Sequence, residues 1–268
     1  MITLLVSEMM PREAIAKLMG YGYEVITLPS FSALPDPIAS HPDSLIAKLS
    51  DRIFTCADYC DRASYVFTDL LERHPWLKLS FLEDRVGKRY PEDARYNLLF
   101  TGEEVILNPR SIAGGILEYT DQAGVQRIEV KQGYPACSTL YLDGLAITAD
   151  PSIEKALLSR GREVLKIGSG YISLPPYEYG FIGGASAVIG RRVFFFGNPE
   201  THPDGGAILG EIKARGYDAV ALLSGGLLDL GGITVIDDDA YYNGNNRQRD
   251  NTAYAEEGVA CVDQYKSQ

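Results

Sequence analysis

Cysteine and histidine, the residues that most often bind transition metals through sulfur and nitrogen, are scarce in this sequence. Its 268 residues include only four cysteines and three histidines. Cys56 and Cys60 form one C-x₃-C pair without a second pair, and the three histidines lie at no zinc-ligand spacing: His41, His74 and His202. We therefore expect no metal site and no cofactor. The default state of the cysteines is free thiols in a reducing cytosol.

Positive charge and long apolar runs are also lacking. Twenty-five Lys and Arg face 36 Asp and Glu, which gives a formal net charge of −11. This balance argues against a nucleic acid or an anionic membrane as the main partner, and it permits a cationic small ligand. No apolar run reaches the roughly 18 residues that span a bilayer, and residues 1–10 contain no basic leader. We expect a cytoplasmic protein, with homodimer formation left open.

Glycine and tyrosine, in contrast, are plentiful, with 27 and 17 residues, and they favour many tight turns and half-buried strands. Alignment of the chain with itself reveals a strand-strand-helix-strand unit of about 40 to 50 residues. In the clearest copy, a hairpin joins Thr139–Leu142 to Ala146–Thr148 through Asp143-Gly144. A helix over Ile153–Ser159 and a strand over Glu163–Ile167 follow.

Four complete copies are predicted, and a fifth is split between the two ends of the sequence. The other three complete copies have helices at Arg62–Arg73, Ser111–Thr120 and Ile208–Lys213. The chain opens with a strand, a helix and a strand over residues 2–28, and Leu227–Leu230 and Ile233–Ile236 supply strand material near the other end. Closure into a ring would unite the halves and remove exposed edges. We predict one domain over residues 1–236 and a polar tail over 237–268.

Five such units around a pseudo-fivefold axis resemble the pentein fold, the α/β propeller of guanidino-group-modifying enzymes. The resemblance covers roughly residues 1–236. Three segments also look like those of a bacterial pentein-like family without an established activity: His41-Pro-Asp, Lys131-Gln-Gly-Tyr-x-x-Cys-Ser and Tyr179-Gly-Phe-Ile-Gly-Gly-Ala-Ser. The alternative is a generic α/β or α+β domain whose repetition is coincidental.

The resemblance implies that the loops entering each hairpin gather at one mouth of a central channel. Under the enzyme interpretation, Cys137 would be the nucleophile and His41 the acid/base residue. Carboxylates would hold a cationic substrate while the thiolate attacks its guanidinium carbon. The substrate-binding candidates in these loops are Asp43, Asp229, Glu92, Asp93, Phe181 and Ser186.

Each of the main candidates also has a purely structural interpretation. Cys137 would serve as a small buried apolar residue, and His41 with Asp43 would stiffen a turn. Asp229 would be a solvated hairpin residue. The sequence repeats the tripeptide at His202-Pro203-Asp204, but there Asp204 has the position of an ordinary helix N-cap.

The chain departs from the enzymes in one respect. Penteins with catalytic activity usually carry the cysteine in the last unit and the histidine near the middle, whereas the last unit here has neither. Cys137 and His41 are nevertheless two units apart, the separation found in the enzymes, which suggests a rotated site. The sequence is therefore compatible with two functions: a Cys-dependent hydrolase or transferase of a guanidino or amidine compound, and a non-catalytic pentein that binds a protein or a small ligand. A phosphate ligand at Gly183–Ser186, where a tight turn is the simpler interpretation, is a third.

Overall fold

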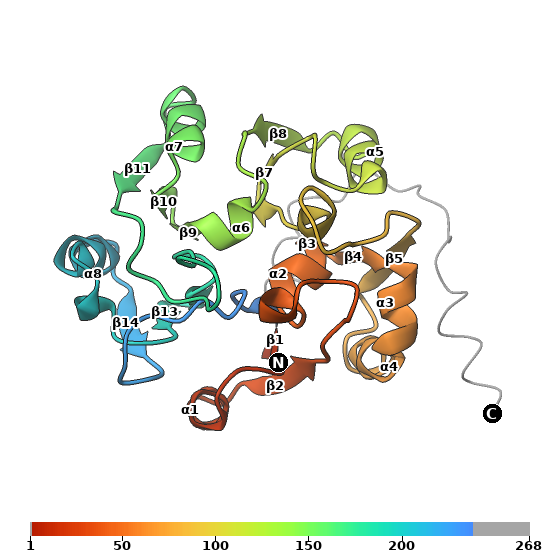
Figure 1. Cartoon of the computed structure of the whole chain (residues 1–268), viewed down its shortest axis with the longest axis horizontal. Helices are drawn as coiled ribbons and strands as arrows, with labels where there is room; N and C mark the ends of the chain where they lie inside the picture. The colour runs from red at the N-terminus through yellow and green to blue at the C-terminus, as the bar shows by residue number, and fades with distance from the viewer. Residues whose placement is uncertain (1, 238–268) are drawn as a thin grey trace.

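Five small sheets of three strands each make up the computed structural model, which describes residues 2–237 (Figure 1). The predicted tail beyond residue 237, including Cys261, lies outside the described residues. The central strands are β4 (Arg52–Cys56), β7 (Glu104–Leu107), β10 (Leu145–Thr148), β13 (Arg192–Phe195) and β1 (Ile2–Ser7). Antiparallel to these run β3 (Ala47–Leu49), β6 (Leu99–Phe100), β9 (Thr139–Leu142), β12 (Ser186–Ile189) and β15 (Thr234–Asp237).

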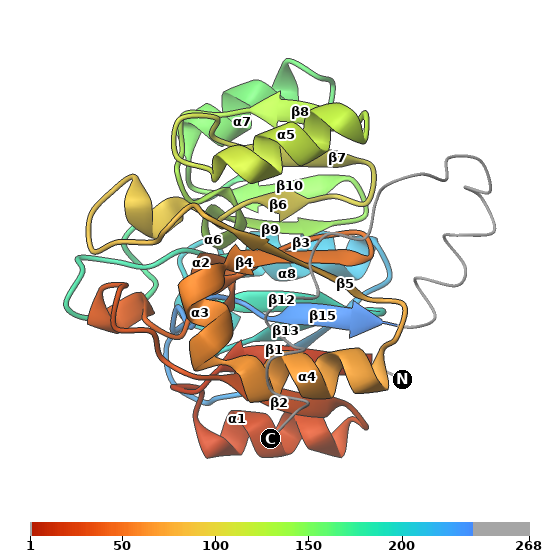
Figure 2. The same ribbon diagram turned by 90° about the vertical axis from the view of Figure 1, so that its right-hand side faces the viewer.

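A parallel strand and a crossover helix complete each unit. The parallel strands are β5 (Lys78–Leu82), β8 (Gln126–Glu129), β11 (Glu163–Lys166), β14 (Asp218–Ala221) and β2 (Glu24–Leu28). The crossover helices are α3 (Ala57–Arg62) with α4 (Ser64–Arg73), α5 (Gly114–Gln122), α7 (Pro151–Leu158), α8 (Gly205–Ala214) and α1 (Arg12–Gly20). These helices lie around the outside of the ring (Figures 1 and 2). The predicted strand-strand-helix-strand unit is thus confirmed.

The antiparallel strands surround a central channel. A cavity of about 290 Å³ is lined by residues of all five of them, among which are Lys48, Phe100, Thr139, Val188 and Val235. The fifth unit has the strand order β15-β1-β2, so both ends of the described chain contribute to it, as expected. The structure is therefore a pentein-like α/β propeller.

Closure of the ring does not remove the sheet edges. Within residues 2–237 every strand pairing stays inside one three-stranded sheet, and the parallel strand of each sheet keeps its outer edge. The units are instead joined by packed side chains. Leu4 and Val6 of the fifth unit, for example, share one buried cluster with Phe194 and Phe196 of the fourth. Each such side chain contributes about 1.5–3 kcal/mol when fully buried.

Local backbone geometry explains where predicted boundaries were wrong. The helix expected over Arg62–Arg73 begins at Ser64, because the backbone at Ala63 (φ −114°, ψ 22°) leaves the helical region, and the separate helix α3, which was not predicted, precedes it. The helix expected from Ser111 begins only at Gly114, since the Asn108 side chain accepts the Arg110 N–H and forms a turn before it. Residues 227–230 form no strand: Leu228 makes only an isolated bridge with Ser173.

None of the helices in residues 2–237 has the length and apolar character needed to cross a membrane. The loops that enter the hairpins carry the remaining short elements: α2 (Pro42–Leu45), α6 (Pro135–Ser138) and the 3₁₀ turns η1 (Asp36–Ile38) and η2 (Glu92–Ala94). A further 3₁₀ turn, η3 (Pro199–Thr201), precedes α8. Helices α2 and α6 lie near the centre of the ring in Figure 1.

Candidate active site

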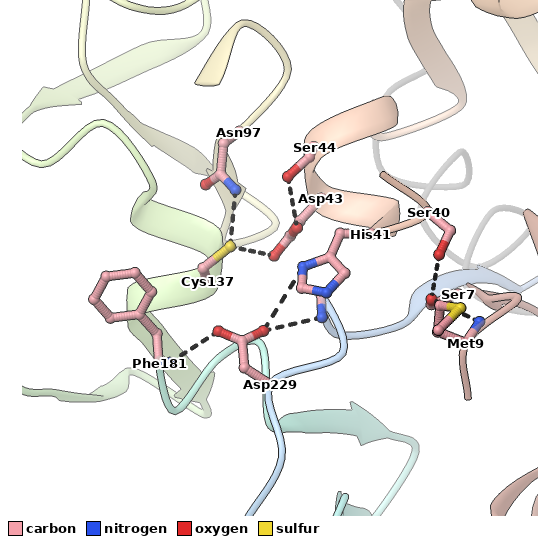
Figure 3. A network of polar contacts seen from close by, with 11 residues as sticks. Ser7, Met9, Ser40, His41, Asp43, Ser44, Asn97, Cys137, Phe181 and Asp229 are labelled. Carbon is pink, nitrogen blue, oxygen red and sulfur yellow. Dashed lines mark hydrogen bonds and ion pairs between the residues drawn. The ribbon is translucent and has the colours of Figure 1, made fainter. Parts of the chain in front are cut away.

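His41 and Asp43 are placed by the short helix α2, which follows η1 in the loop entering the first hairpin. Pro42 occupies the first helical position, where its missing N–H has no partner to lose. The His41 carbonyl accepts hydrogen bonds from Ser44 and Leu45, which closes the turn. Asp43 borders the channel cavity, and His41 is 2% exposed. One tight turn therefore presents both side chains to the same place (Figure 3).

The Cys137 sulfur, on helix α6, is held by residues from two other loops. The thiol donates a hydrogen bond to Oδ2 of Asp43 across 2.6 Å. Nδ2 of Asn97 donates to the sulfur at 3.2 Å, while Oδ1 of Asn97 accepts the backbone N–H of Ala136 at 2.8 Å. Loops from three consecutive units thus converge on one sulfur atom (Figure 3).

Asp229, from the loop before β15, forms the opposite wall. Its Oδ2 accepts the backbone N–H of Phe181 at 2.9 Å, and its Oδ1 accepts that of Gly231 at 3.0 Å. Oδ1 also lies 3.8 Å from Nδ1 of His41, which has no hydrogen-bond partner among the described residues. Two backbone amides therefore fix this carboxylate beside the imidazole and next to the space in front of Cys137 (Figure 3).

Glycines permit this close approach. A Cβ on Gly184 would lie 2.0 Å from Oδ1 of Asp229, and one on Gly231, whose φ is +75°, would lie 2.4 Å from the Cβ of His41. The amide of Gly184 donates to the Cys137 carbonyl, and that of Ser186 to the Gly183 carbonyl. Because these amides have partners within the fold, the segment Gly183–Ser186 is a packed turn and not a phosphate cradle.

Burial dominates the electrostatics of the site. It raises the pKa of Asp43 well above its usual value, with the nearby Asp229 as the second cause. It raises the pKa of Asp229 to about 6 and lowers that of His41 to about 4. The pKa of the Cys137 thiol is raised well above normal, first by burial and then by the Asp43 and Asp229 charges. At neutral pH the thiol is therefore protonated and the imidazole is neutral.

A cavity of about 310 Å³ opens in front of these groups. His41, Cys137 and Asp229 contribute to its wall. Its other lining residues are mainly aromatic and acidic: Tyr134, Tyr177, Tyr179, Phe181, Asp93 and Glu178. Such a wall suits a small organic cation, which both carboxylates and aromatic faces attract.

Five of the eight predicted residues line this cavity, and three do not. Asp43 faces the channel cavity, although its carboxylate contacts the Cys137 thiol. Glu92 is exposed, and its side chain packs over Gly87 while the neighbouring Asp93 faces inward. Ser186 donates its hydroxyl to the Ile182 carbonyl and lines the channel cavity instead. Phe181 contributes through its backbone N–H as well as its place in the wall.

Sequence reasoning missed Asn97, Tyr134 and Tyr177. Asn97 offered no sequence signal, because it lies 40 residues from the cysteine that it contacts. Tyrosines recur at positions 171, 177 and 179 of one predicted channel-mouth loop, and this enrichment could have indicated an aromatic wall. Cys56 and Cys60 are buried and do not line this cavity, and no cluster in residues 2–237 could hold a metal ion.

Comparison with known proteins gives a family and a fold. A profile described as "Family of unknown function (DUF6873)" matches residues 5–234. No curated protein matches the chain. A DDAH from Pseudomonas aeruginosa, solved with citrulline, is 11% identical with a TM-score of 0.54, and the match covers 82% of this chain and 90% of that one.

Two further solved structures have the same architecture. A dimethylarginine dimethylaminohydrolase adduct with 4-chloro-2-hydroxymethylpyridine is 11% identical over 97% of both chains, with a TM-score of 0.52. An amidinotransferase from Microseira wollei is also 11% identical, covers 84% of this chain and 78% of that one, and has a TM-score of 0.52. At this identity the likeness establishes the pentein fold alone.

Proposed function

The chain belongs to the family of unknown function DUF6873 and has the pentein fold, and on this basis we propose that it is a cysteine-dependent enzyme acting on a small guanidino or amidine compound. Guanidino-modifying enzymes are among its structural neighbours. The observation that carries the proposal is the 2.6 Å contact between the Cys137 sulfur and Asp43, beside a second fixed carboxylate and an unpartnered imidazole nitrogen.

Charge favours a cationic substrate. Asp229 is buried and Asp43 is half-buried. Within the described part of the chain, neither Lys nor Arg lines the cavity that Asp229 borders, whereas Asp43 borders the channel cavity together with Lys48. Two desolvated carboxylates without a cation are costly, which is why their pKa values are raised. A guanidinium between them would supply the missing charge through charge-assisted hydrogen bonds.

The same cation would activate the thiol. Burial and the two carboxylates disfavour the thiolate in the free protein. A bound guanidinium offsets the negative potential and lowers the pKa of Cys137, so that the nucleophile forms only when substrate is present. The Asp43 carboxylate, already the acceptor of the thiol hydrogen bond, takes the proton.

The reaction follows from this arrangement. The thiolate attacks the guanidinium carbon, a C–S bond forms, and the C=N π electron pair moves onto nitrogen. The tetrahedral adduct collapses, a C–N bond breaks, and the leaving amine departs with the proton that Asp43 took from the thiol. Water then adds to the sulfur-bound amidinium carbon and gives a proton to His41. Breaking the C–S bond returns the thiol and releases a urea; an acceptor amine in place of water would give amidino transfer.

A second candidate is a non-catalytic pentein that binds a cationic ligand. It is favoured by the raised pKa of the Cys137 thiol and by the fact that its hydrogen-bond partner is a carboxylate and not His41. In this case Asp43 and Asp229 would bind a cation and Cys137 would only fill space.

Turnover of simple alkylguanidines tests the proposal. Butylguanidine, incubated with the full-length protein, should yield an alkylurea with ammonia, or urea with butylamine, all measurable by mass spectrometry. Acid quenching should trap the amidino group on Cys137. The variant Cys137→Ser should lose both signals, whereas Cys56→Ser should keep them. Calorimetric binding of butylguanidine without product or adduct would overturn catalysis in favour of the second candidate. No binding at all would overturn both.

A further inference from the structure

A large open groove lies between the second and third units, away from the candidate active site. Its volume is about 1310 Å³, which exceeds the roughly 300–1,000 Å³ typical of small-molecule sites. Strand β8 and the residues after it form one side, and helix α7 of the next unit forms the other (Figures 1 and 2). No described residue lines both this groove and the cavity in front of Cys137. The groove is therefore a separate surface, with room for an extended chain.

Small side chains on α7 keep the groove open. The residues of α7 and its C-cap that line it lie three or four positions apart and so share one face of the helix: Ser152, Lys155, Ala156 and Ser159. An adjoining face carries Ile153 and Leu157, which pack with Ile128 of β8 in one buried cluster. Helix α7 is thus anchored to the second unit by its apolar face, while its small and polar face borders the groove.

The outer edge of β8 faces this groove. Residues 127–131 all line it, although successive side chains of a strand point to opposite faces of the sheet, so the feature that they share is the strand edge. Val130 donates its N–H to the Leu107 carbonyl of β7, and by alternation the N–H and the carbonyl of Glu129 point to the outer side. Within residues 2–237 no strand pairs with this edge. It is a template for an added strand.

Positive charge distinguishes this edge from the outer edges of the other four sheets. The chain has a formal net charge of −11, yet the charged residues among the described lining of the groove are five cations and one anion: Arg110, Arg127, Lys131, Lys155, Arg160 and Glu129. A groove lined by one sign of charge concentrates the electrostatic potential and attracts groups of the opposite sign. The groove therefore favours an anionic partner.

Three of these cations have no ion-pair partner within the described part of the chain. They are Arg110, Lys131 and Lys155, and all three side chains are exposed. Arg127 and Arg160, by contrast, already have carboxylate partners. The three unpaired cations can each accept an anionic group without breaking an existing ion pair.

Asn108 fixes the backbone that carries two of these cations. It is 5% exposed, its Oδ1 accepts the N–H of Arg110 at 3.0 Å, and its Nδ2 donates to the Lys131 carbonyl at 2.8 Å. The same Nδ2 donates to the hydroxyl of Tyr90, another lining residue, at 3.2 Å. Because this end of the groove is organised before any partner arrives, less conformational entropy is lost on binding.

We propose that the groove binds an extended acidic segment of a partner protein, which adds as a strand to the outer edge of β8. The backbone of the segment pairs with Glu129, and its carboxylates pair with Arg110, Lys131 and Lys155. A peptide supplies both kinds of group. A nucleic acid supplies phosphates but no strand, and the net charge of −11 repels it outside the groove. This surface has no part in the chemistry proposed at Cys137.

A fluorescein-labelled octapeptide of alternating Glu and Thr tests the proposal by fluorescence anisotropy with the full-length protein. It should bind, and its affinity should fall as the salt concentration increases, whereas the corresponding Lys and Thr peptide should not bind. Arg110→Glu combined with Lys155→Glu should weaken binding about 30-fold. The matched control, Arg12→Glu with Lys213→Glu, makes the same change in net charge at two exposed helix positions outside the groove, and should change the affinity by at most about twofold.

A backbone-modified peptide tests the added strand. The same octapeptide N-methylated at every residue keeps its carboxylates but loses its backbone donors, and should bind about tenfold more weakly. Equal affinity of the two peptides, equal effects of the two double variants, or no binding of the acidic peptide overturns the proposal. Displacement of the peptide by an equal concentration of tripolyphosphate or oligothymidylate would assign the groove to phosphates and also overturns it. If the groove variant does not fold, the salt dependence and the N-methylated peptide still decide.

Discussion

The tripeptide His-Pro-Asp occurs twice in this chain, and the two copies have opposite environments. In the first, Nδ1 of His41 lacks a hydrogen-bond partner within residues 2–237, and Asp43 accepts the hydrogen bond of the Cys137 thiol. In the second, both ring nitrogens of His202 are engaged: Nδ1 with the Asp204 amide at 3.0 Å and Nε2 with the Gly168 carbonyl at 3.2 Å. Both histidines are 2% exposed, so burial does not distinguish them.

The difference arises from position relative to the channel. His41-Pro42-Asp43 lies in a loop that enters a hairpin, so its side chains turn inward to meet those of other units. The second copy lies between β13 and α8, on the crossover side of its unit, where Oδ2 of Asp204 accepts the Gly168 amide. The same tripeptide therefore contacts the Cys137 thiol at the channel and stabilises a turn elsewhere.

Removing the carboxylate charge should give the largest difference between the two copies of the tripeptide, measured as the alkylation rate of Cys137. Asp43→Asn takes away both a cation partner and the proton acceptor of the thiol. Alkylation of Cys137 by the cationic reagent 2-chloroacetamidine should then slow by about 1000-fold. Asp204→Asn, the matched control, should leave the rate unchanged. Peptide mass spectrometry measures the alkylation rates. Equal rates in the two variants would show that Asp43 takes no part in binding the cation or in activating the thiol.

Removing the imidazoles should have the next largest effect. His41→Gln should lower turnover of the alkylguanidine about 100-fold through loss of acid/base catalysis. The affinity for the guanidinium should change little, because the carboxylates remain. His202→Gln should retain wild-type turnover. A similar loss of turnover in both variants would show that the histidines act through the fold and not through chemistry.

The pH dependence of binding should follow Asp229. A proton competes with the cation for this carboxylate, whose pKa is raised to about 6. Affinity for butylguanidine should therefore be lost as pH falls, by about tenfold per unit below pH 6. The raised pKa of Asp43 should add a further gain in affinity as pH increases. In Asp229→Asn the step near pH 6 should vanish; a calorimetric profile that keeps this step would assign it to another group.

The smallest expected effect is on the free energy of unfolding, where substitution of His202 should matter more than substitution of His41. His202→Leu leaves the Asp204 amide and the Gly168 carbonyl without partners, and should lower the free energy of unfolding by about 1–2 kcal/mol. The corresponding fall in Tm is about 2–8 °C. His41→Leu should cost less, because its Nδ1 has no bond to lose. Calorimetric melting that ranks His41→Leu as the more damaging change would contradict this assignment.

Local patterns were sufficient to predict the units of the fold, but not the contacts of the site. The hairpin strand Thr139–Leu142 is confirmed to the residue because its Asp143-Gly144 turn is determined locally: both residues have positive φ. Glu92 and Asp93 are adjacent in one 3₁₀ turn, and the local sequence did not indicate which of the two side chains would face inward. Asn97 and Tyr134 reach the site through the arrangement of units around the channel, which periodicity does not specify.

Recognition of a guanidinium-like cation beside the Cys137 thiol is the claim on which the proposed function depends. The most direct measurement compares the rates at which 2-chloroacetamidine and neutral chloroacetamide alkylate individual cysteines at pH 7. Cys56 is the internal control, since burial raises its pKa too but neither Asp43 nor Asp229 lies among the causes. The cationic reagent should react with Cys137 about 100-fold faster than the neutral one, and the two should differ little at Cys56. Equal preference at both cysteines, or no labelling of Cys137, would contradict the claim.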